Sequence, residues 1–237
     1  MPDGGSTGIG ASVKRKEDYR FLVGEGNYTD DINRPNQTYT YMLRSSSAHA
    51  KFSIDTSKAS KAKGVVKIFV GTDMEVGSIP CGWQVDSKDG TPMREPAHPP
   101  IAKDKVRYVG EIIAVIIAES LEDAKNAAEL IDVNYDDIPV IIDMQDALDN
   151  SKGLVHDEIE SNVCYDWELG DSEAVDKAIS EAAHITTLDI RNNRLIPNAM
   201  ETRSAIGDYE HATGQYTLYT TSQNPHLIRL LMGAFVL

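Results

Sequence analysis

The residues best suited to chemistry in this sequence lie near its end, in a polar run that joins two elements. Gln223 occupies the run Thr221-Ser222-Gln223-Asn224, directly before a proline. A helix that begins here presents free backbone N–H groups and a partial positive charge, which suit an anionic ligand. The side-chain amide of Gln223 adds two donors and one acceptor. From the residues alone, the run fits either simple helix capping or a ligand contact.

A second candidate is the run Met200-Glu201-Thr202-Arg203, which follows Pro197 in a loop between two predicted strands. A carboxylate and a guanidinium two residues apart suit a charge-assisted pair that locks a corner of the chain. The same two groups also suit the binding of a third, external group. We favour the structural role and leave the binding role open.

The other reactive residue types form no local motif. The histidines contain no HExxH, HxH or HxxxH pattern and therefore predict no local metal site; they are His49, His98, His156, His184, His211 and His226. Cys81 and Cys164 are too few for a disulfide scaffold or an iron–sulfur site. The sequence also lacks a phosphate-binding loop, a nucleophile elbow and a dinucleotide fingerprint.

Composition places the chain among acidic globular proteins. Its 23 basic and 37 acidic residues give a formal net charge of −14. That sign argues against nucleic acids and anionic membranes as partners. No apolar run approaches the ~20 residues of a membrane-spanning helix, and the first residues do not resemble a secretory signal. We therefore expect a cytoplasmic protein with no transmembrane segment.

Apolar periodicity predicts the elements that must position these residues. Strands are predicted at 38–44, 65–70, 112–118, 131–135, 140–142, 185–191 and 215–221. Helices are predicted at 56–63, 121–131, 171–183 and 226–237. The continuous β-branched run at 112–118 is typical of a strand that is covered on both faces. The strand–helix–strand order that follows predicts that part of the sheet is parallel.

Several stretches lack such periodicity. Residues 1–18 are predicted to be a flexible arm, and residues 143–170 a linker between two units. The loop at 71–102 is too long for a simple connector, so it is either a lid or interface segment or a meander over a sheet edge. The final helix ends in apolar residues without a C-cap. We expect a fragment of a longer protein or, alternatively, a complete chain whose last helix docks on a partner.

Segments spread over nearly the whole chain carry a resemblance to a known family. They are Gly8 to Ser12, Arg15 to Asp31, Ala48-His49-Ala50, Tyr108 to Ala118, Ala127 to Tyr135 with Pro139, Asn193 to Arg203, and Thr220 to His226. In order and spacing they resemble the large subunit of xanthine oxidase-family molybdenum hydroxylases, especially the aerobic carbon monoxide dehydrogenase branch. The resemblance implies an α+β fold. It places a mixed-sheet α/β hammerhead domain at 19–142 and the incomplete start of a molybdopterin-binding domain at 171–237.

The resemblance also implies an activity. Enzymes of this family oxidise CO, or hydroxylate aldehydes, purines and other N-heterocycles, with oxygen taken from water. Molybdenum on molybdopterin cytosine dinucleotide accepts two electrons, which pass to [2Fe–2S] clusters on a small subunit and to FAD on a medium subunit. Two such heterotrimers form a dimer. A family glutamine hydrogen-bonds an oxo group on the molybdenum, and Gln223 matches its segment.

The sequence departs from the family in four ways that limit this expectation. It contains no Gly-Gly-Gly-Phe-Gly loop, no match to the catalytic glutamate and no substrate-defining loop, and Thr202 replaces a usual proline. No catalytic residue is therefore expected in this chain, which alone should bind no molybdenum and be inactive. The remainder of the large subunit is expected to be a partner. The alternative is a catalytically inactive, stand-alone hammerhead domain with a structural or assembly role.

Overall fold

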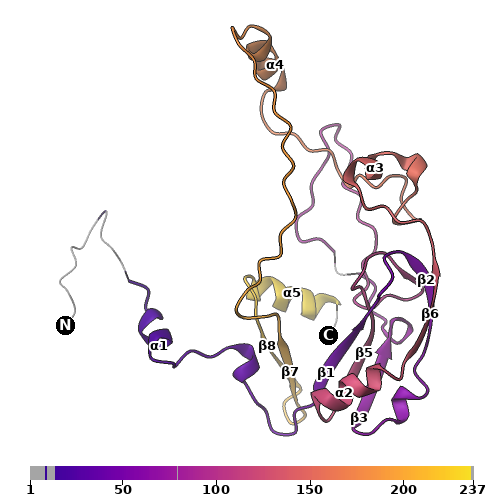
Figure 1. Cartoon of the computed structure of the whole chain (residues 1–237). Coiled ribbons are helices and arrows are strands. Elements are labelled where there is room, and N and C mark those ends of the chain that lie inside the picture. Colours follow the sequence, from indigo (N-terminus) through magenta and orange to yellow (C-terminus); the bar gives the residue numbers. More distant parts are fainter. Residues whose placement is uncertain (1–8, 10–13, 79, 236–237) are drawn as a thin grey trace. The chain divides into compact units, whose positions relative to one another are not determined.

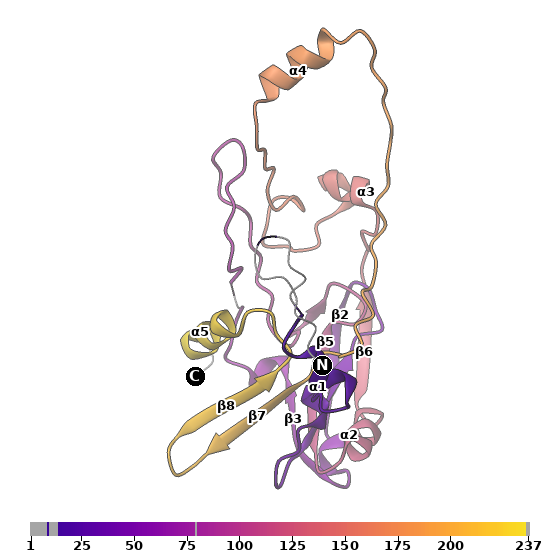
Figure 2. The same ribbon diagram turned by 90° about the vertical axis from the view of Figure 1, so that its left-hand side faces the viewer.

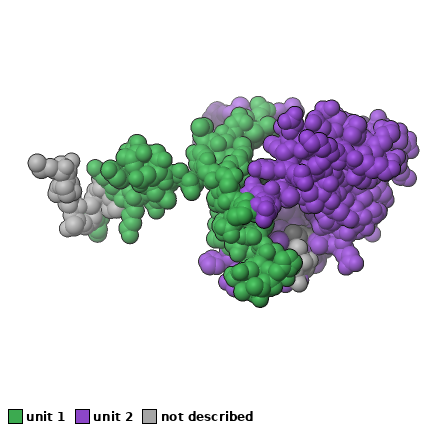
Figure 3. Space-filling model, turned by 90° about the horizontal axis from the view of Figure 1, so that it is seen from below, with its two compact units in different colours: residues 1–35, 192–225 green, residues 36–191, 226–237 purple. Residues whose placement is uncertain are grey.

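The computed structural model describes residues 9, 14–78 and 80–235. The chain divides into two compact units, which Figure 3 shows in different colours. The smaller unit joins residues 1–35 to 192–225, and the larger unit joins 36–191 to 226–237. Most of the predicted arm and the last two residues of the predicted terminal helix lie outside the described residues. These units divide the chain at other positions than the domain boundaries expected from the sequence. They do not test those boundaries, which stay predictions.

The larger unit is built around β5 (Ile112–Ala118), which lies between β1 (Tyr39–Arg44) and β3 (Val65–Val70) (Figure 1). Both neighbours pair with β5 in antiparallel register. The side chains of Ile113 and Ile116 are 1% and 0% exposed. The prediction of a strand covered on both faces is therefore confirmed.

The larger unit contains a second three-stranded sheet. Its middle strand is β2 (Ala50–Asp55), which pairs with β4 (Lys105–Val106) and β6 (Asp132–Asp137). Between β5 and β6 the chain forms α2 (Leu121–Ala128), and the Oγ of Ser120 caps this helix by accepting the Asp123 N–H at 3.0 Å. Three buried alanines of α2 share one hydrophobic cluster with β5: Ala124, Ala127 and Ala128.

The prediction of a parallel pair is wrong. All strand pairs among the described residues are antiparallel, and β5 and β6 belong to different sheets. The reason is that β1 and β3 already occupy both edges of β5. The chain leaving α2 cannot pair with β5 and adds to β2 instead.

Several other elements differ from the sequence predictions. No strand forms at 140–142 or at 185–191, and the predicted helix at 56–63 is reduced to a 3-10 turn at Ala59–Lys61. The strand at 185–191 has no neighbouring strand to pair with among the described residues. Strand β2 and the strand at Ala205–Glu210 were not predicted. The loop at 71–102 holds one 3-10 turn, Gly71–Asp73, and an isolated bridge between Asp86 and Pro92.

The smaller unit contains a β-hairpin, which is seen in full in Figure 2. It consists of β7 (Ala205–Glu210) and β8 (Gln215–Thr220), joined by a turn at residues 211–214. Near the start of the chain, α1 (Asp18–Leu22) is followed by a 3-10 turn at Thr29–Asp31.

The remaining helices are α3 (Met144–Leu148), α4 (Ser172–Ser180) and α5 (Pro225–Phe235). Helix α4 lies within the predicted helix at 171–183, and its larger apolar side chains are uncovered, with Val175 54% and Ile179 50% exposed. In the described part of the chain, none of the helices has the length and apolar content needed to cross a bilayer.

Removing the buried side chain of Ile116 should destabilise the larger unit. Ile116→Ala should lower the free energy of unfolding by about 2–5 kcal/mol, because it leaves a cavity under a strand covered on both faces. Urea unfolding followed by far-UV circular dichroism measures this. The control, Val66→Ala, removes a side chain that is 58% exposed on the neighbouring strand, and should change stability by no more than about 0.5 kcal/mol. Equal effects of the two substitutions would contradict the buried position of Ile116.

The two ends of the long loop meet at Gly71, where a side chain has no room. A Cβ there would collide with the Ala102 carbonyl and lie 2.7 Å from the Lys103 Cα. Gly71→Ala should therefore destabilise the chain by about 1–3 kcal/mol. Gly77→Ala is the control, because no atom lies within 4 Å of its added Cβ. A wild-type unfolding midpoint for Gly71→Ala would show that the ends do not approach so closely.

Candidate functional site

Gln223 lies in the short segment between the end of β8 at Thr220 and the start of α5 at Pro225. Its side chain is exposed and has no hydrogen-bond partner among the described residues. Helix α5 begins at the proline that the sequence placed at its first position. The segment therefore presents an amide, free to donate, ahead of a helix of eleven residues.

Glu201 and Arg203 do not form the ion pair that the sequence suggested. Glu201 Oε1 instead accepts hydrogen bonds from the Thr29 backbone N–H at 3.1 Å and from the Thr29 hydroxyl at 3.4 Å. The salt bridges found between described residues do not include Arg203. Glu201 therefore has a structural role, but its partner is Thr29, which lies 172 positions away in the sequence, and not Arg203.

His49, in the Ala-His-Ala run, links the start of β2 to the residues that follow β6. Its Nδ1 lies 2.7 Å from the Pro139 carbonyl oxygen, and a carbonyl oxygen only accepts, so Nδ1 must carry the proton. The backbone carbonyl of His49 accepts the Ile138 N–H at 3.0 Å. His49 is 7% exposed. Its contacts fix the end of β6 against β2.

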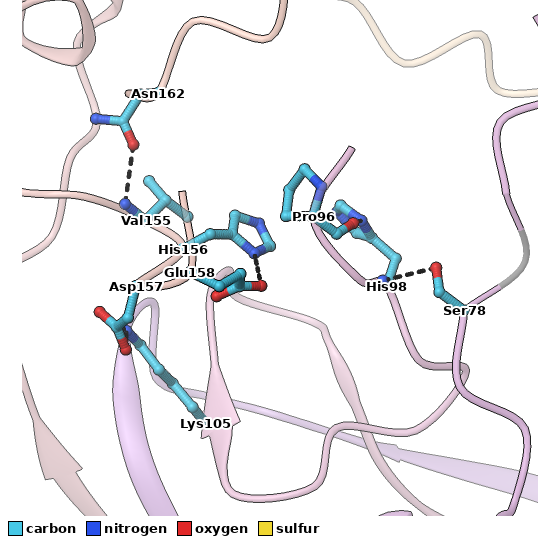
Figure 4. A network of polar contacts seen from close by, with 9 residues as sticks. All are labelled: Ser78, Pro96, His98, Lys105, Val155, His156, Asp157, Glu158 and Asn162. Atoms are coloured by element: carbon cyan, nitrogen blue, oxygen red, sulfur yellow. Dashed lines mark hydrogen bonds and ion pairs between the residues drawn. The ribbon is translucent and has the colours of Figure 1, made fainter. Parts of the chain in front are cut away.

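A polar cluster that the sequence did not predict lies where the chain segment around residue 156 meets β4 (Figure 4). Lys105, with a side chain 7% exposed, contacts both carboxylate oxygens of Asp157 at 3.0 and 3.1 Å. The Lys105 hydrogen bond lowers the pKa of Asp157. Because the Asp157 side chain is 76% exposed, solvent weakens this pair.

His156 is a second buried titratable group of this cluster. Its Nδ1 lies 3.4 Å from Glu158 Oε1, and its ring centroid lies 5.2 Å from that of His98. Burial lowers the pKa of His156, and the nearby Arg107 charge lowers it further. The imidazole is therefore neutral at neutral pH and packs as an aromatic ring.

A cavity of about 580 Å³ opens beside these two rings, between the long loop and the segment at 141–164. Its lining includes both cysteines, Cys81 and Cys164. Among the described residues, no three His, Cys, Asp or Glu side chains come together in a way that could hold a metal ion. No sequence pattern links the two sides of this cavity, so only the folded chain shows it.

Two domain models match the chain in sequence order. The a/b hammerhead domain of aldehyde oxidase and xanthine dehydrogenase matches residues 23–139. The molybdopterin cofactor-binding domain matches residues 155–236. The second match contains Glu201 and Gln223, and the first contains both three-stranded sheets.

Individual relatives are similar along almost the whole chain. The carbon monoxide dehydrogenase large chain of Afipia carboxidovorans is 29% identical over 95% of this chain and 29% of its own length. The nicotine 6-hydroxylase large subunit of Paenarthrobacter nicotinovorans is 31% identical over 96% of this chain and 28% of its own. The crystal structure of quinoline 2-oxidoreductase from Pseudomonas putida 86 matches with a TM-score of 0.80 and 30% identity, over 94% of this chain and 28% of that one.

The chain thus spans less than a third of the length of each of these three relatives. Within that span, the α+β fold and the order of the two domains agree with the resemblance drawn from the sequence. The chain therefore belongs to the aldehyde oxidase and xanthine dehydrogenase family of molybdenum oxidoreductases, and is homologous to the large, molybdenum-binding subunit of CO dehydrogenase and related hydroxylases.

Proposed function

We propose that this chain is part of the large subunit of a molybdenum hydroxylase that oxidises CO or hydroxylates an aldehyde or an N-heterocycle, with water as the oxygen source. The observation that carries the proposal is the tandem match, in which the molybdopterin cofactor-binding model follows the hammerhead model. A stand-alone hammerhead domain is not favoured, because the similarity continues well beyond residue 139.

The residues of this chain fit a contact with the cofactor at one position. Gln223 has an exposed side-chain amide with no hydrogen-bond partner among the described residues, and an amide N–H suits an oxygen acceptor on molybdenum. When bound, molybdopterin cytosine dinucleotide would supply the molybdenum that takes two electrons from the substrate. Gln223 would donate to an oxygen of that group and orient it, and it would stabilise negative charge that develops there.

The proposed partners follow from the relatives. One relative is named as a subunit of a dehydrogenase complex, 6-hydroxypseudooxynicotine dehydrogenase subunit gamma. We infer that electrons leave toward a small subunit with [2Fe–2S] clusters and a medium subunit with FAD, in a cytoplasmic dimer of heterotrimers. The remainder of the large subunit completes the site, which this chain alone does not build.

Purification with its natural partners tests this assignment. The chain is tagged and expressed with its neighbouring genes in a host that makes the cofactor. We expect it to co-purify with polypeptides that carry flavin and iron, and with molybdenum in an amount comparable to the flavin. Mass spectrometry and metal analysis measure this. Recovery of the chain alone, with no molybdenum, flavin or iron, would contradict the proposed function.

Substitution of Gln223 tests its role in that complex. Gln223→Ala should lower kcat by about 10²–10³-fold while molybdenum content stays unchanged, because it removes one donor to a charged oxygen. Gln215→Ala is the matched control, since Gln215 is an exposed glutamine at the far end of the same strand. If Gln223→Ala and Gln215→Ala have equal kcat values, Gln223 does not contact the cofactor.

A further inference from the structure

We propose that Glu201 is a positioning residue for Gln223, which it serves by holding the turn that carries Gln223 at the open end of the β7–β8 hairpin. It acts with Thr29, Ser204 and Thr221, and we call these four residues the brace. The functional importance of the brace rests on the proposed function of Gln223. The contacts that form the brace are observed in the structure and do not depend on that proposal.

Hydrogen bonds, not apolar packing, hold the described part of the smaller unit together. All buried hydrophobic residues among those described belong to the larger unit. The buried residue that the described part of the smaller unit contributes is polar: Thr29, which is 8% exposed. Within these residues, the contacts that hold the hairpin are therefore polar.

The first contact of the brace ties the hairpin to the beginning of the chain. Glu201 Oε1 accepts from the Thr29 backbone N–H at 3.1 Å and from its hydroxyl at 3.4 Å. Hydrogen bonds to a carboxylate are stronger than neutral ones. The Thr29 turn is itself closed by Asp31, whose Oδ2 accepts the Tyr28 N–H at 2.8 Å. Glu201 therefore bonds to a turn that is itself held by a hydrogen bond.

The second contact continues the hairpin beyond its last backbone pair, Ala205 with Thr220. Thr221 Oγ1 accepts the Ser204 N–H at 3.2 Å, and Thr220 Oγ1 donates to the Ser204 carbonyl at 3.1 Å. The Thr221 N–H lies 3.4 Å from the same carbonyl oxygen. Side-chain hydrogen bonds thus reinforce the backbone pairing where the strands end.

The turn that follows is closed around Gln223. Ser222 Oγ accepts the Asn224 N–H at 3.0 Å, which is the hydrogen bond of a serine turn and fixes the backbone on both sides of Gln223. Thr221 is thus held before the turn, and Asn224 is held after it. The side chain of Gln223 stays exposed, so the brace fixes its backbone without occupying its amide.

Glu201 is connected to this turn through one residue. Thr202 follows it in the chain, and the Thr202 carbonyl lies 3.4 Å from Thr221 Oγ1. When Glu201 releases Thr29, the segment that bears Thr202 and Ser204 and leads into β7 loses this contact. The bonds to Thr221 then open more often. The side-chain amide of Gln223 can then still donate hydrogen bonds, but its position is no longer fixed.

Amide hydrogen exchange on the purified 237-residue chain tests this, with no cofactor needed. Glu201→Ala should speed exchange of the peptide spanning 219–224 by about tenfold, because it removes a charge-assisted hydrogen bond. Glu201→Gln keeps an accepting oxygen and should restore exchange to within about threefold of wild type. Glu210→Ala is the matched control. Glu210 also accepts from a threonine, Thr213, but at the far tip of the hairpin, and should leave 219–224 unchanged.

A second pair of variants covers the case in which Glu201→Ala fails to fold. Thr221→Val removes the hydroxyl at nearly constant shape and should speed exchange of 219–224, while Thr221→Ser keeps the hydroxyl and should not. Unchanged exchange in Glu201→Ala and Thr221→Val would overturn the proposal. So would a failure of Glu201→Gln and Thr221→Ser to restore protection. Because these measurements use the cofactor-free chain, their failure is distinct from a failure of the molybdenum assignment.

Discussion

The burial of both faces of β5 is the constraint on which the larger unit depends. Ile113 and Ile116 are almost completely inaccessible, and β1 and β3 pair with both edges of the strand. A strand with no free edge cannot accept the chain that returns from α2. That chain therefore forms β6 on a second sheet, and β2 becomes the middle strand there. The antiparallel topology thus follows from the position of one apolar strand.

The smaller unit depends on polar contacts instead. The Arg34 guanidinium contacts Asp208 at 2.6 Å and lies 5.8 Å from the Tyr219 ring centre, so it ties the chain before β1 to both strands of the hairpin. The hydrogen bond that Arg34 donates to the Asp208 carboxylate raises the pKa of Arg34. Glu201 and Thr29 make a further polar connection, at the segment that leads into β7. The larger unit is thus fixed by packing, whereas the smaller unit is fixed by charge and hydrogen bonding.

Sequence reasoning succeeded where a local pattern determines the structure. The strand predicted from the β-branched run at 112–118 and the helix predicted to follow Asn224 are both observed. It failed where contacts with residues distant in the sequence determine the structure of a segment. Whether 185–191 becomes a strand depends on a neighbour, and the choice of β2 as the partner of β6 depends on the occupied edges of β5.

The candidate site shows the same division. Glu201 stood out from its charge and setting, but its partner Thr29 lies 172 positions away; the sequence suggested Arg203 instead. Lys105 and Asp157, 52 positions apart, carry no pattern that would connect them. The amide of Gln223 was visible in the sequence, yet its proposed role comes from the family resemblance. Its geometry supplies an exposed donor on a fixed turn.

The proposed contact between Gln223 and a molybdenum cofactor can be seen in an experimental structure of the chain within its purified, cofactor-loaded complex. We expect the Gln223 side-chain nitrogen within about 3.2 Å of an oxygen atom on the molybdenum group, with Glu201 still bonded to Thr29. A cofactor bound elsewhere, with the Gln223 amide in solvent or bonded only to protein, would contradict it.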